Sequence, residues 1–398
     1  MSNQYAHIIG WGKYLPPRVV TNEEISRIVD TSDEWIMART GIRERRIAGP
    51  GETTATLAFE AAARALEVAD VHPSEVDLII VATSTPETIF PATASLVQDY
   101  LGSRNAGAFD LSAACSGFVY ALSMASNAIS AGSSQVALVI GAETMSRVLD
   151  WQDRGTCILF GDGAGAVVLK GSSVPGGLLA SSLRSDGSGA DLLRLPAVYS
   201  SPVPGLDPTF SANGHPRTIT MNGRQIFRFA TQVVSDIVEE VMEKADLTPD
   251  DVALIIPHQA NARIVEAAAK KLKMPVERFF LNLEHAGNTS AASIPIALCD
   301  AVEAGRLAPN DNVIFVGFGG GLTWAASVLK WDVTPPPVSL SQRQWRRMRY
   351  VIARTRSRLR QTGRSVSSMV SGSPTPEARM RDAERNEHKS KSKKKRKA

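Results

Sequence analysis

The sequence predicts an α/β fold made of two similar halves, followed by a basic extension. Short apolar and β-branched runs bounded by Gly, Pro or Asp alternate with longer stretches of helical period. A segment of the first half recurs in the second at a constant spacing, and the net charge changes sign near residue 334. These three observations predict a globular body over residues 1–333 and a separate tail.

Four apolar runs have the length and composition of buried parallel strands, with crossover helices between them. They are Leu78–Val81, Val136–Ile140, Leu254–Ile256 and Val313–Val316. Helices are predicted at Thr53–Val68, which is rich in Ala, and at Gln225–Ala245. In the second helix, apolar residues three or four apart predict one buried face formed by Ile226, Phe229, Val233, Ile237 and Val241.

The halves are recognised by an internal repeat. Pro73–Ile80 (PSEVDLII) matches Pro249–Ile256 (PDDVALII) at an offset of 176 residues, and the strands ending at Gly141 and Gly317 share that offset. This predicts two α/β halves, residues 1–175 and 176–333, related by a pseudo-twofold axis. A solenoid is excluded because the period is far longer than a solenoid repeat.

The repeat also predicts a central meeting point. Ser112–Cys115 (SAAC) and Ser290–Ser293 (SAAS) each precede an apolar helix, at an offset of 178, which predicts a two-residue length change. Under a pseudo-twofold axis the two helix N-termini should approach each other. Their partial positive charges would favour an anion between them, so chemistry is expected there.

Composition and cysteine content narrow the class of protein. The 30 Gly and 22 Pro are close to average usage and exclude collagen-like or wholly disordered chains. Three cysteines (Cys115, Cys157 and Cys299) are too few for a disulfide scaffold and suit a reducing compartment. No apolar stretch approaches the roughly 18 residues of a membrane span. A cytoplasmic protein is therefore expected.

The tail carries most of the positive charge. Residues 334–398 hold 19 Lys and Arg against 4 Asp and Glu, a net charge of +15, which leaves −11 on residues 1–333. Gln344–Arg360 has the pattern of a basic helix that would suit an anionic membrane, and His388–Lys397 resembles a nucleic-acid-binding patch. The favoured interpretation is a disordered extension without an essential role. Nucleic-acid or membrane contact remains the alternative.

Cys115 is the candidate nucleophile. In Asp110–Phe118 (DLSAACSGF) a strand ends, small residues turn the chain, and a helix begins near the thiol. Such a helix N-terminus is expected to lower the thiol pKa, and small neighbours leave room for a substrate. The alternative is a buried packing cysteine, which is the interpretation kept for Cys157, at the start of an apolar strand, and for Cys299, within a helix.

Three further segments carry candidate groups, two of them directly after predicted strands. His258 follows a strand directly, at the edge where functional side chains of α/β sheets concentrate. Asn288 precedes a helix and is either a functional amide or an N-cap. Gly317–Gly321 (GFGGG) would let backbone N–H groups approach a ligand oxygen. A nucleotide-phosphate loop is not supported, because the segment lacks GxGxxG spacing and a following Gly-Lys-Ser/Thr.

Together these segments resemble the β-ketoacyl-acyl-carrier-protein synthase III family of the thiolase superfamily. The resemblance runs from about Ile8 to Trp331 and rests on ordered motifs: TSDEWI at 31–36, RTGIRER at 39–45, SAACSGF at 112–118, DRGT at 153–156, FGDGAGA at 160–166, PHQAN at 257–261, GNTSAAS at 287–293 and GFGGG at 317–321. It implies the thiolase-like, duplicated five-layer α/β/α/β/α fold and a homodimer.

The resemblance also implies the chemistry. Cys115 would be the nucleophile of a Cys-His-Asn set completed by His258 and Asn288, with the backbone N–H groups of Cys115 and Gly320 as the oxyanion hole. His285 would be structural. The reaction implied is the decarboxylative condensation of a short acyl-CoA, acetyl-CoA being favoured, with malonyl-acyl-carrier protein. It requires no metal or redox cofactor.

Matching positions imply the substrate contacts. Trp35, Arg39 and Arg154 would bind CoA, because an indole face and a guanidinium plane can sandwich adenine while another Arg meets phosphate. Phe90 would cross the dimer interface and limit the size of the primer.

A basic surface is expected for the acidic carrier protein. Arg263, Lys270 and Lys271 share one helix face, and Arg228 at a matching position would join them. An ordinary solvated face is the alternative, although a basic stripe is informative on a body of net charge −11.

Two other functions remain as alternatives. A related condensing enzyme that starts a polyketide or other secondary-metabolite pathway would carry the same three residues with a different primer. A nucleic-acid or membrane-binding protein acting through its tail is the second, and the intact Cys-His-Asn set argues against it.

Overall fold

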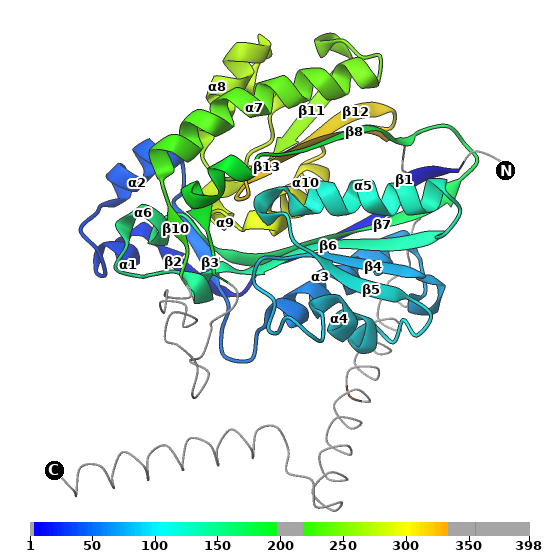
Figure 1. The fold of residues 1–398 in the computed structure, drawn as a ribbon, viewed down its shortest axis with the longest axis horizontal. Coiled ribbons are helices and arrows are strands. Elements are labelled where there is room, and N and C mark those ends of the chain that lie inside the picture. The colour runs from blue at the N-terminus through cyan, green and yellow to red at the C-terminus, as the bar shows by residue number, and fades with distance from the viewer. Residues whose placement is uncertain (1–3, 197–217, 333–354, 356–398) are drawn as a thin grey trace, which may run out of the picture. The chain divides into compact units, whose positions relative to one another are not determined.

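A computed structural model describes residues 4–196, 218–332 and 355 (Figure 1). The chain divides into a compact unit, Met1–Arg343, and a second unit, Gln344–Ala398. Thr355 is the described residue of the second unit, and it is helical within the predicted basic helix Gln344–Arg360. The rest of that helix and the charged segment His388–Lys397 lie outside the described residues.

The first sheet has five strands in the order β1-β7-β6-β4-β5. They are β1 (Tyr5–Tyr14), β7 (Asp162–Ser172), β6 (Val136–Thr144), β4 (Leu78–Ala82) and β5 (Gly107–Leu111). β4 is parallel to β5 and β6, as predicted, whereas β7 is antiparallel to both β6 and β1. β5 lies at one edge of the sheet.

The second sheet repeats this order and these directions in four strands, β8-β13-β12-β11. An isolated parallel bridge between Ile255 and Phe279 stands where the fifth strand would pair. The four strands are β8 (Gly177–Ser185), β13 (Thr323–Trp331), β12 (Asp311–Gly319) and β11 (Val252–Pro257).

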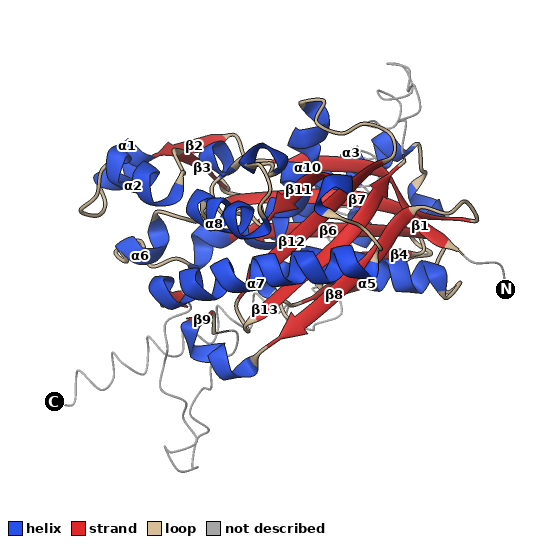
Figure 2. Cartoon of the chain, turned by 90° about the horizontal axis from the view of Figure 1, so that it is seen from above, coloured by secondary structure: helices blue, strands red, loops and turns tan. Residues whose placement is uncertain are grey.

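Helices form three layers around the two sheets (Figure 1), and α7 is seen to cross the strands of the second sheet in Figure 2. The outer face of the second sheet is covered by α7 (Gly223–Lys244) and α8 (Ala262–Leu272), and that of the first by α3 (Thr54–Ala69) and α4 (Thr93–Leu101). Between the sheets lie α5 (Gly117–Ser130) and α10 (Ser293–Glu303). The predicted five-layer fold is therefore confirmed.

Smaller elements gather at one end of the unit (Figures 1 and 2). They are α1 (Asn22–Ser26), α2 (Asp33–Thr40), α6 (Arg154–Cys157), α9 (Leu283–Ala286), β2 (Arg18–Thr21), β3 (Glu44–Ile47), β9 (Leu193–Arg194) and β10 (Thr220–Met221). Cys157 therefore ends a short helix, where the sequence predicted the start of a strand. Among the described residues, no helix is both long and apolar enough to span a bilayer.

Side-chain caps fix where the helices begin. Thr53 caps α3 through a capping box with Thr56, Ser32 caps α2, and Asn261 caps α8 by accepting from the N–H of Arg263. The amide nitrogen of Asn261 also donates to the carbonyl of Arg39, 2.9 Å away. This cap therefore ties the start of α8 to the end of α2.

The buried stripe of α7 is rotated from the predicted one. Ile226, Ile237 and Val241 are buried as expected, but Ala230 and Val234 replace Phe229 and Val233, which are only partly buried. Phe229 packs on the edge of the stripe, with its ring 5.5 Å from that of Trp324. Small residues at the centre of the stripe let the helix approach the sheet, so large side chains move to its flank.

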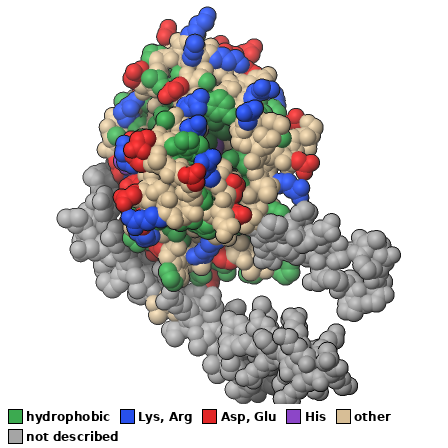
Figure 3. All heavy atoms as spheres, turned by 90° about the vertical axis from the view of Figure 1, so that its left-hand side faces the viewer, with side chains coloured by type: hydrophobic (Ala, Val, Ile, Leu, Met, Phe, Trp, Pro, Cys, Tyr) green, Lys and Arg blue, Asp and Glu red, His purple; other side chains and the backbone are tan. Residues whose placement is uncertain are grey.

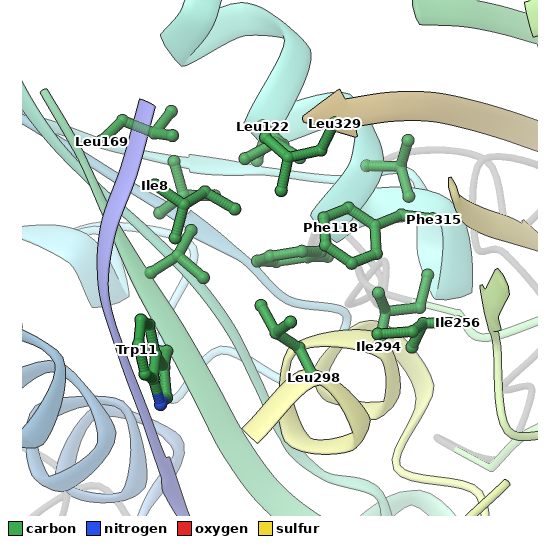
Figure 4. Packing of buried hydrophobic residues seen from close by; sticks show 14 of the residues in the cluster. Ile8, Trp11, Phe118, Leu122, Leu169, Ile256, Ile294, Leu298, Phe315 and Leu329 are labelled. Atoms are coloured by element: carbon green, nitrogen blue, oxygen red, sulfur yellow. The ribbon is translucent and has the colours of Figure 1, made fainter. Parts of the chain in front are cut away.

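The main core joins both halves. Side chains of α5, α10 and both sheets meet between the sheets (Figure 4), where the rings of Phe118 and Phe315 lie 6.3 Å apart, edge to face. Phe118 comes from the first half and Phe315 from the second. This shared core holds the N-termini of α5 and α10 at a fixed separation.

The structure corrects the predicted offset of 178. The turns η2 (Ala114–Ser116) and η8 (Ser290–Ala292) begin at Ala114 and Ser290, both with positive φ (46° and 49°), and α5 and α10 begin at Gly117 and Ser293. The offset is 176 throughout, so the predicted length change is wrong. The two Ser-Ala-Ala segments are therefore similar in letters but do not occupy equivalent positions in the two halves. The predicted meeting of the helix N-termini is confirmed.

Candidate active site

A cavity of about 920 Å³ opens beside the contact between η2 and η8. Cys115, His258 and Asn288 all line it. They arrive from three places: η2, the end of β11, and the turn before η8. The structure therefore brings the three predicted chemical groups into one space, with both halves contributing.

Cys115 lies at the cavity wall, 6 % exposed, and its Sγ donates to the hydroxyl of Ser290, 3.5 Å away. Burial raises the pKa of the Cys115 thiol to about 12. The sequence predicted the opposite direction from the helix N-terminus. Loss of hydration outweighs the hydrogen bond with Ser290, which acts in the opposite direction, so the resting group is a thiol. A neighbour would have to take its proton before the sulfur could act as a nucleophile.

His258 follows β11 and is 2 % exposed. Its Nδ1 lies 2.7 Å from the hydroxyl of Ser293, and its ring meets that of Phe318 edge to face, 5.1 Å away. Burial lowers the pKa of the imidazole to about 3, because the apolar surroundings disfavour its charged form. His258 is therefore neutral at physiological pH.

Asn288 is held by its backbone between two residues of the first half. Its N–H donates to the carbonyl of Leu159 (2.9 Å), and its carbonyl accepts from Gly161 (3.0 Å). Its Oδ1 accepts from the N–H of Ser290 at 2.9 Å. No acceptor among the described residues contacts Nδ2, which leaves the amide donor for the cavity. His285 is exposed and does not line the cavity.

Two glycines allow the close approaches that build the site. A Cβ on Gly141 of β6 would stand 2.2 Å from the carbonyl oxygen of Ala291, so η8 rests directly on this strand. A Cβ on Gly319 would stand 2.8 Å from the backbone nitrogen of Cys115. Gly319 lines the cavity, and Gly320, the predicted oxyanion donor, is the next residue and does not line it.

The predicted CoA residues form a stack at the cavity wall. The guanidinium carbons of Arg39 and Arg154 lie 4.2 and 4.9 Å from the centre of the Trp35 indole. All three residues line the cavity. Arg154 also donates to the carbonyl of Asp30, 2.7 Å away, which anchors its side chain. The structure therefore brings these residues together with Cys115.

The predicted carrier-protein residues divide into two groups. Arg263, Arg228 and Lys270 are exposed, and Arg263 lines the cavity with its guanidinium over the Phe227 ring, 5.5 Å away. Lys271 instead forms an ion pair with Asp236 of α7, 2.5 Å away. Lys271 therefore braces α8 against α7.

Sequence reasoning missed Arg224, which is exposed, lines the cavity and precedes Arg228 by one helical turn on α7. Its spacing of four residues from Arg228 was the available signal. Lys and Arg side chains are visible on this end of the molecule in Figure 3, among hydrophobic and acidic ones.

Phe90 is 85 % exposed and does not line this cavity. Ile89 beside it and Phe109 on the edge strand β5 are also exposed. Phe109 therefore places apolar surface on the outer edge of the first sheet. Within the described ranges, no group of three or more His, Cys, Asp or Glu side chains is arranged to hold a metal ion.

Comparison with known proteins agrees with the geometry. Residues 109–187 match the family 3-oxoacyl-[acyl-carrier-protein (ACP)] synthase III, and residues 242–331 match its C-terminal region. A β-ketoacyl-[acyl-carrier-protein] synthase III of Clostridium acetobutylicum is 49 % identical over 325 residues, which is 81 % of this chain and 98 % of the relative.

Solved structures match over the same extent. The 3-oxoacyl-[acyl-carrier-protein] synthase III of Aquifex aeolicus superimposes with a TM-score of 0.75 at 47 % identity, covering 82 % of this chain and 99 % of that one. The priming β-ketosynthase of the R1128 polyketide pathway gives 0.77 at 38 % identity, with 84 % and 98 % covered. The chain belongs to the β-ketoacyl-[acyl-carrier-protein] synthase III family, the thiolase-like condensing acyltransferases that initiate fatty-acid synthesis.

Proposed function

We propose that this enzyme transfers a short acyl group, acetyl first, from CoA to Cys115 and condenses it with malonyl-acyl-carrier protein. The products are a 3-oxoacyl-carrier protein, CoA and CO2. The observation that carries this assignment is that Cys115, His258 and Asn288 line one cavity together with Trp35 and two arginines. Acyl transfer from CoA needs a thiol that accepts the acyl group and a stack that can hold a nucleotide. Condensation needs hydrogen-bond donors for the enolate, and the cavity offers two.

The donors are assigned from their hydrogen bonds. The Oδ1 of Asn288 is occupied by Ser290, so Nδ2 would donate to the thioester oxygen of the malonyl group as CO2 leaves. The hydroxyl of Ser293, which accepts from the N–H of Gln259, can donate to Nδ1 of His258. Nε2 would then carry the proton and donate to the same oxygen.

The oxyanion hole of the condensation is assigned to the N–H groups of Cys115 and Gly320. Support comes from Gly319, whose lack of a side chain lets the glycine segment pack on the backbone of Cys115. Removing one oxyanion donor typically costs about 3 kcal/mol of transition-state stabilisation. No step requires a metal or redox cofactor, since the thiol and these donors supply the chemistry.

CoA is assigned to Trp35, Arg39 and Arg154. Adenine would enter between the indole and a guanidinium, and the displaced arginine would meet phosphate. The carrier protein is assigned to the exposed Arg263, Arg228 and Lys270 beside the cavity. Lys271 would support this surface indirectly through its ion pair with Asp236.

A homodimer is proposed on the exposed edge of the first sheet. β5 leaves backbone groups unpaired and carries the exposed Phe109, a combination that invites pairing with a second copy. Phe90 also exposes a large apolar side chain. Phe90 would then reach the partner's cavity and limit primer length. Residues 1–175 and 176–333 remain the proposed halves, and a cytoplasmic site of action suits the three free cysteines.

A second candidate is priming of a polyketide pathway, supported by the similarity of the chain to the R1128 priming β-ketosynthase, at 38 % identity and a TM-score of 0.77. The same residues would serve both functions, so the identity of the acyl primer distinguishes the two. Nucleic-acid or membrane contact through residues 334–398 rests on composition alone, since that segment lies outside the described residues apart from Thr355.

Intact-protein mass spectrometry with a panel of acyl-CoAs tests the proposal. Acetyl-CoA should add one acetyl group, mapped to the peptide that contains Cys115, and malonyl-carrier protein should then remove it. Cys115→Ala should abolish the label while the protein stays folded. His258→Ala and Asn288→Ala should still be acylated but fail to decarboxylate malonyl-carrier protein. Preference for a longer acyl-CoA would favour the polyketide candidate.

A further inference from the structure

A chain of hydrogen bonds leads from the nucleophile into the protein interior. The Sγ of Cys115 donates to the hydroxyl of Ser290 (3.5 Å), which donates in turn to Oε1 of Glu143 (3.0 Å). Ser290 belongs to η8 and Glu143 to β6, so the chain crosses from one half to the other and back. Neither Ser290 nor Glu143 lines the cavity.

Glu143 is a fully buried carboxylate whose hydrogen bonds define its role. It accepts from the hydroxyl of Thr85 (2.6 Å), the hydroxyl of Thr83 (3.3 Å) and the N–H of Ser84 (3.1 Å), besides Ser290. Every contact is a donor, so the carboxylate is held as an acceptor. A buried carboxylate with no cationic partner among these contacts is a costly group to retain for packing alone.

Cys115 is the titratable group that this chain joins to Glu143. Other titratable side chains lie on the elements packed against β6: Glu60, Arg64 and Glu67 on α3, Tyr120 on α5, Asp162 and Lys170 on β7, and Cys299, Asp300 and Glu303 on α10. Of these, Asp162 accepts from Ser146 and Ala48, and Asp300 pairs with Lys13. The hydrogen bonds of Glu143 end on Thr83, Ser84, Thr85, Ser290 and the backbone N–H of Ala291, none of which is a titratable group.

Of the two bases near the thiol, Glu143 has the higher proton affinity. Burial raises the pKa of Glu143 to about 7, the donors around it lowering that value only in part. Burial lowers the pKa of His258 to about 3. The carboxylate is therefore a much stronger base than the imidazole that shares the cavity with the thiol.

We propose that Glu143 is a positioning residue that accepts the proton of the Cys115 thiol through the hydroxyl of Ser290. The inference rests on the function proposed above. As the S–H bond of Cys115 breaks, that proton forms a new O–H bond on Ser290. The original O–H bond of Ser290 breaks at the same time, and its proton forms an O–H bond on Oε1 of Glu143. Cys115 becomes a thiolate, Glu143 becomes neutral, and the total charge is unchanged.

The same route restores the enzyme. When condensation expels the sulfur of Cys115 as a thiolate, Ser290 donates to it and receives the proton of Glu143 in exchange. The CoA thiolate released in the first half-reaction takes its proton from solvent at the open cavity. The thiol proton is therefore stored inside the protein for the lifetime of the acyl-enzyme, and His258 stays neutral throughout.

Glu143→Gln tests the inference, because the amide keeps the shape of the side chain and one acceptor oxygen but does not take up a proton. Two rates are measured from pH 5 to 10 on the full chain: acetylation by acetyl-CoA, by mass spectrometry, and alkylation of Cys115 by iodoacetamide. At pH 7 both should fall about 100-fold, the usual scale for loss of a general base. The wild-type rates should level off above about pH 7, as Glu143 ionises, whereas the variant rates should keep rising.

Thr54→Val is the matched control. Thr54 makes buried hydrogen bonds to Thr85 and Thr144 in the same region, but does not contact the chain. It should keep the wild-type pH profile, and Glu143→Gln should decarboxylate malonyl-carrier protein at the wild-type rate. If Glu143→Gln does not fold, Ser290→Ala interrupts the chain at its centre and should give the same two losses.

Two results would overturn the inference. One is a variant rate within about threefold of wild type at pH 7 with an unchanged pH profile, far below the usual contribution of a general base. The other is an equal fall in acylation and decarboxylation, which indicates a structural role. Alkylation requires no acyl substrate, so it tests Glu143 even if acetyl-CoA leaves wild-type Cys115 unlabelled, the result that would refute the proposed function.

Discussion

The hydroxyl of Ser293 lies 2.7 Å from Nδ1 of His258 and 3.4 Å from the backbone nitrogen of Gln259. The N–H of Gln259 donates to that hydroxyl, so the serine proton is available to Nδ1. This arrangement favours the tautomer with the proton on Nε2, the nitrogen left for the cavity. Ser293, at the start of α10, therefore determines that Nε2 of His258 is the nitrogen that can donate a hydrogen bond into the cavity.

Ser293→Ala should separate the two half-reactions. Decarboxylation of malonyl-carrier protein should fall about tenfold, because a hydrogen bond of this kind contributes about 1–1.5 kcal/mol. Acetylation of Cys115 should keep its wild-type rate. Stopped-flow release of CO2 and mass spectrometry of the acyl-enzyme measure the two steps. Ser327→Ala, which removes another buried serine from β13, serves as the control; equal losses in both steps would contradict the role given to Ser293.

The burial of neutral His258 should appear in the pH dependence of stability. Below about pH 6.5 the unfolded chain binds a proton that the folded site, where burial lowers the pKa of His258 to about 3, excludes. The free energy of unfolding of wild type should therefore fall relative to His258→Gln by about 1.5 kcal/mol between pH 6.5 and 5. Urea denaturation at both pH values measures this difference. A gap that stays constant would show that His258 is free to protonate.

The stack of Arg39 and Arg154 on Trp35 should contribute to binding of acetyl-CoA but not of malonyl-carrier protein. Trp35→Ala should raise KM for acetyl-CoA about tenfold, in line with about 1–2 kcal/mol for a cation–π contact. Trp35→Phe keeps an aromatic ring, so its KM for acetyl-CoA should lie between those of the wild type and Trp35→Ala. KM for malonyl-carrier protein and the rate of its decarboxylation should not change. A rise in the carrier-protein KM alone would move Trp35 out of the CoA site.

The contact of η8 with β6 should not tolerate a methyl group. In Gly141→Ala the new Cβ would lie 2.2 Å from the carbonyl oxygen of Ala291, so η8 must shift. Overpacking of this kind costs about 1–3 kcal/mol of unfolding free energy, and condensation should fall further because Ser290 moves with η8. Gly187→Ala, whose Cβ would meet no atom within 4 Å, should leave stability and activity unchanged. Denaturation and condensation assays compare the two.

The parts of the fold that follow from local patterns could be predicted from the sequence. The runs at Leu78–Val81 and Leu254–Ile256 became parallel strands in equivalent places, because buried β-branched segments have few other solutions. The antiparallel strands β7 and β13 were not foreseen, since the direction of a strand depends on which partner it meets. The similar sequences Ser112–Cys115 and Ser290–Ser293 led to a wrong prediction of the offset, because they do not occupy equivalent positions in the two halves.

In the candidate site, too, some residues could be predicted from the sequence and others could not. Cys115, His258 and Asn288 stand at strand ends and helix starts, where local signals exist. Glu143 carries no such signal, and its hydrogen bond with Ser290 could not be predicted because it depends on how closely the two halves pack. The pKa direction of Cys115 failed for a related reason: the helix start is visible in sequence, whereas complete desolvation is visible only in three dimensions.

The two backbone hydrogen bonds of Asn288, to Leu159 and from Gly161, have a consequence for how the enzyme fails. The residue whose side-chain amide we propose as an enolate donor is held by a segment that lies more than a hundred residues earlier in the chain. Heat or denaturant that breaks these two hydrogen bonds should abolish activity before either sheet unfolds. A cleaved enzyme whose fragments drift apart would retain a thiol on one piece and an imidazole on the other, and neither piece could complete a cycle.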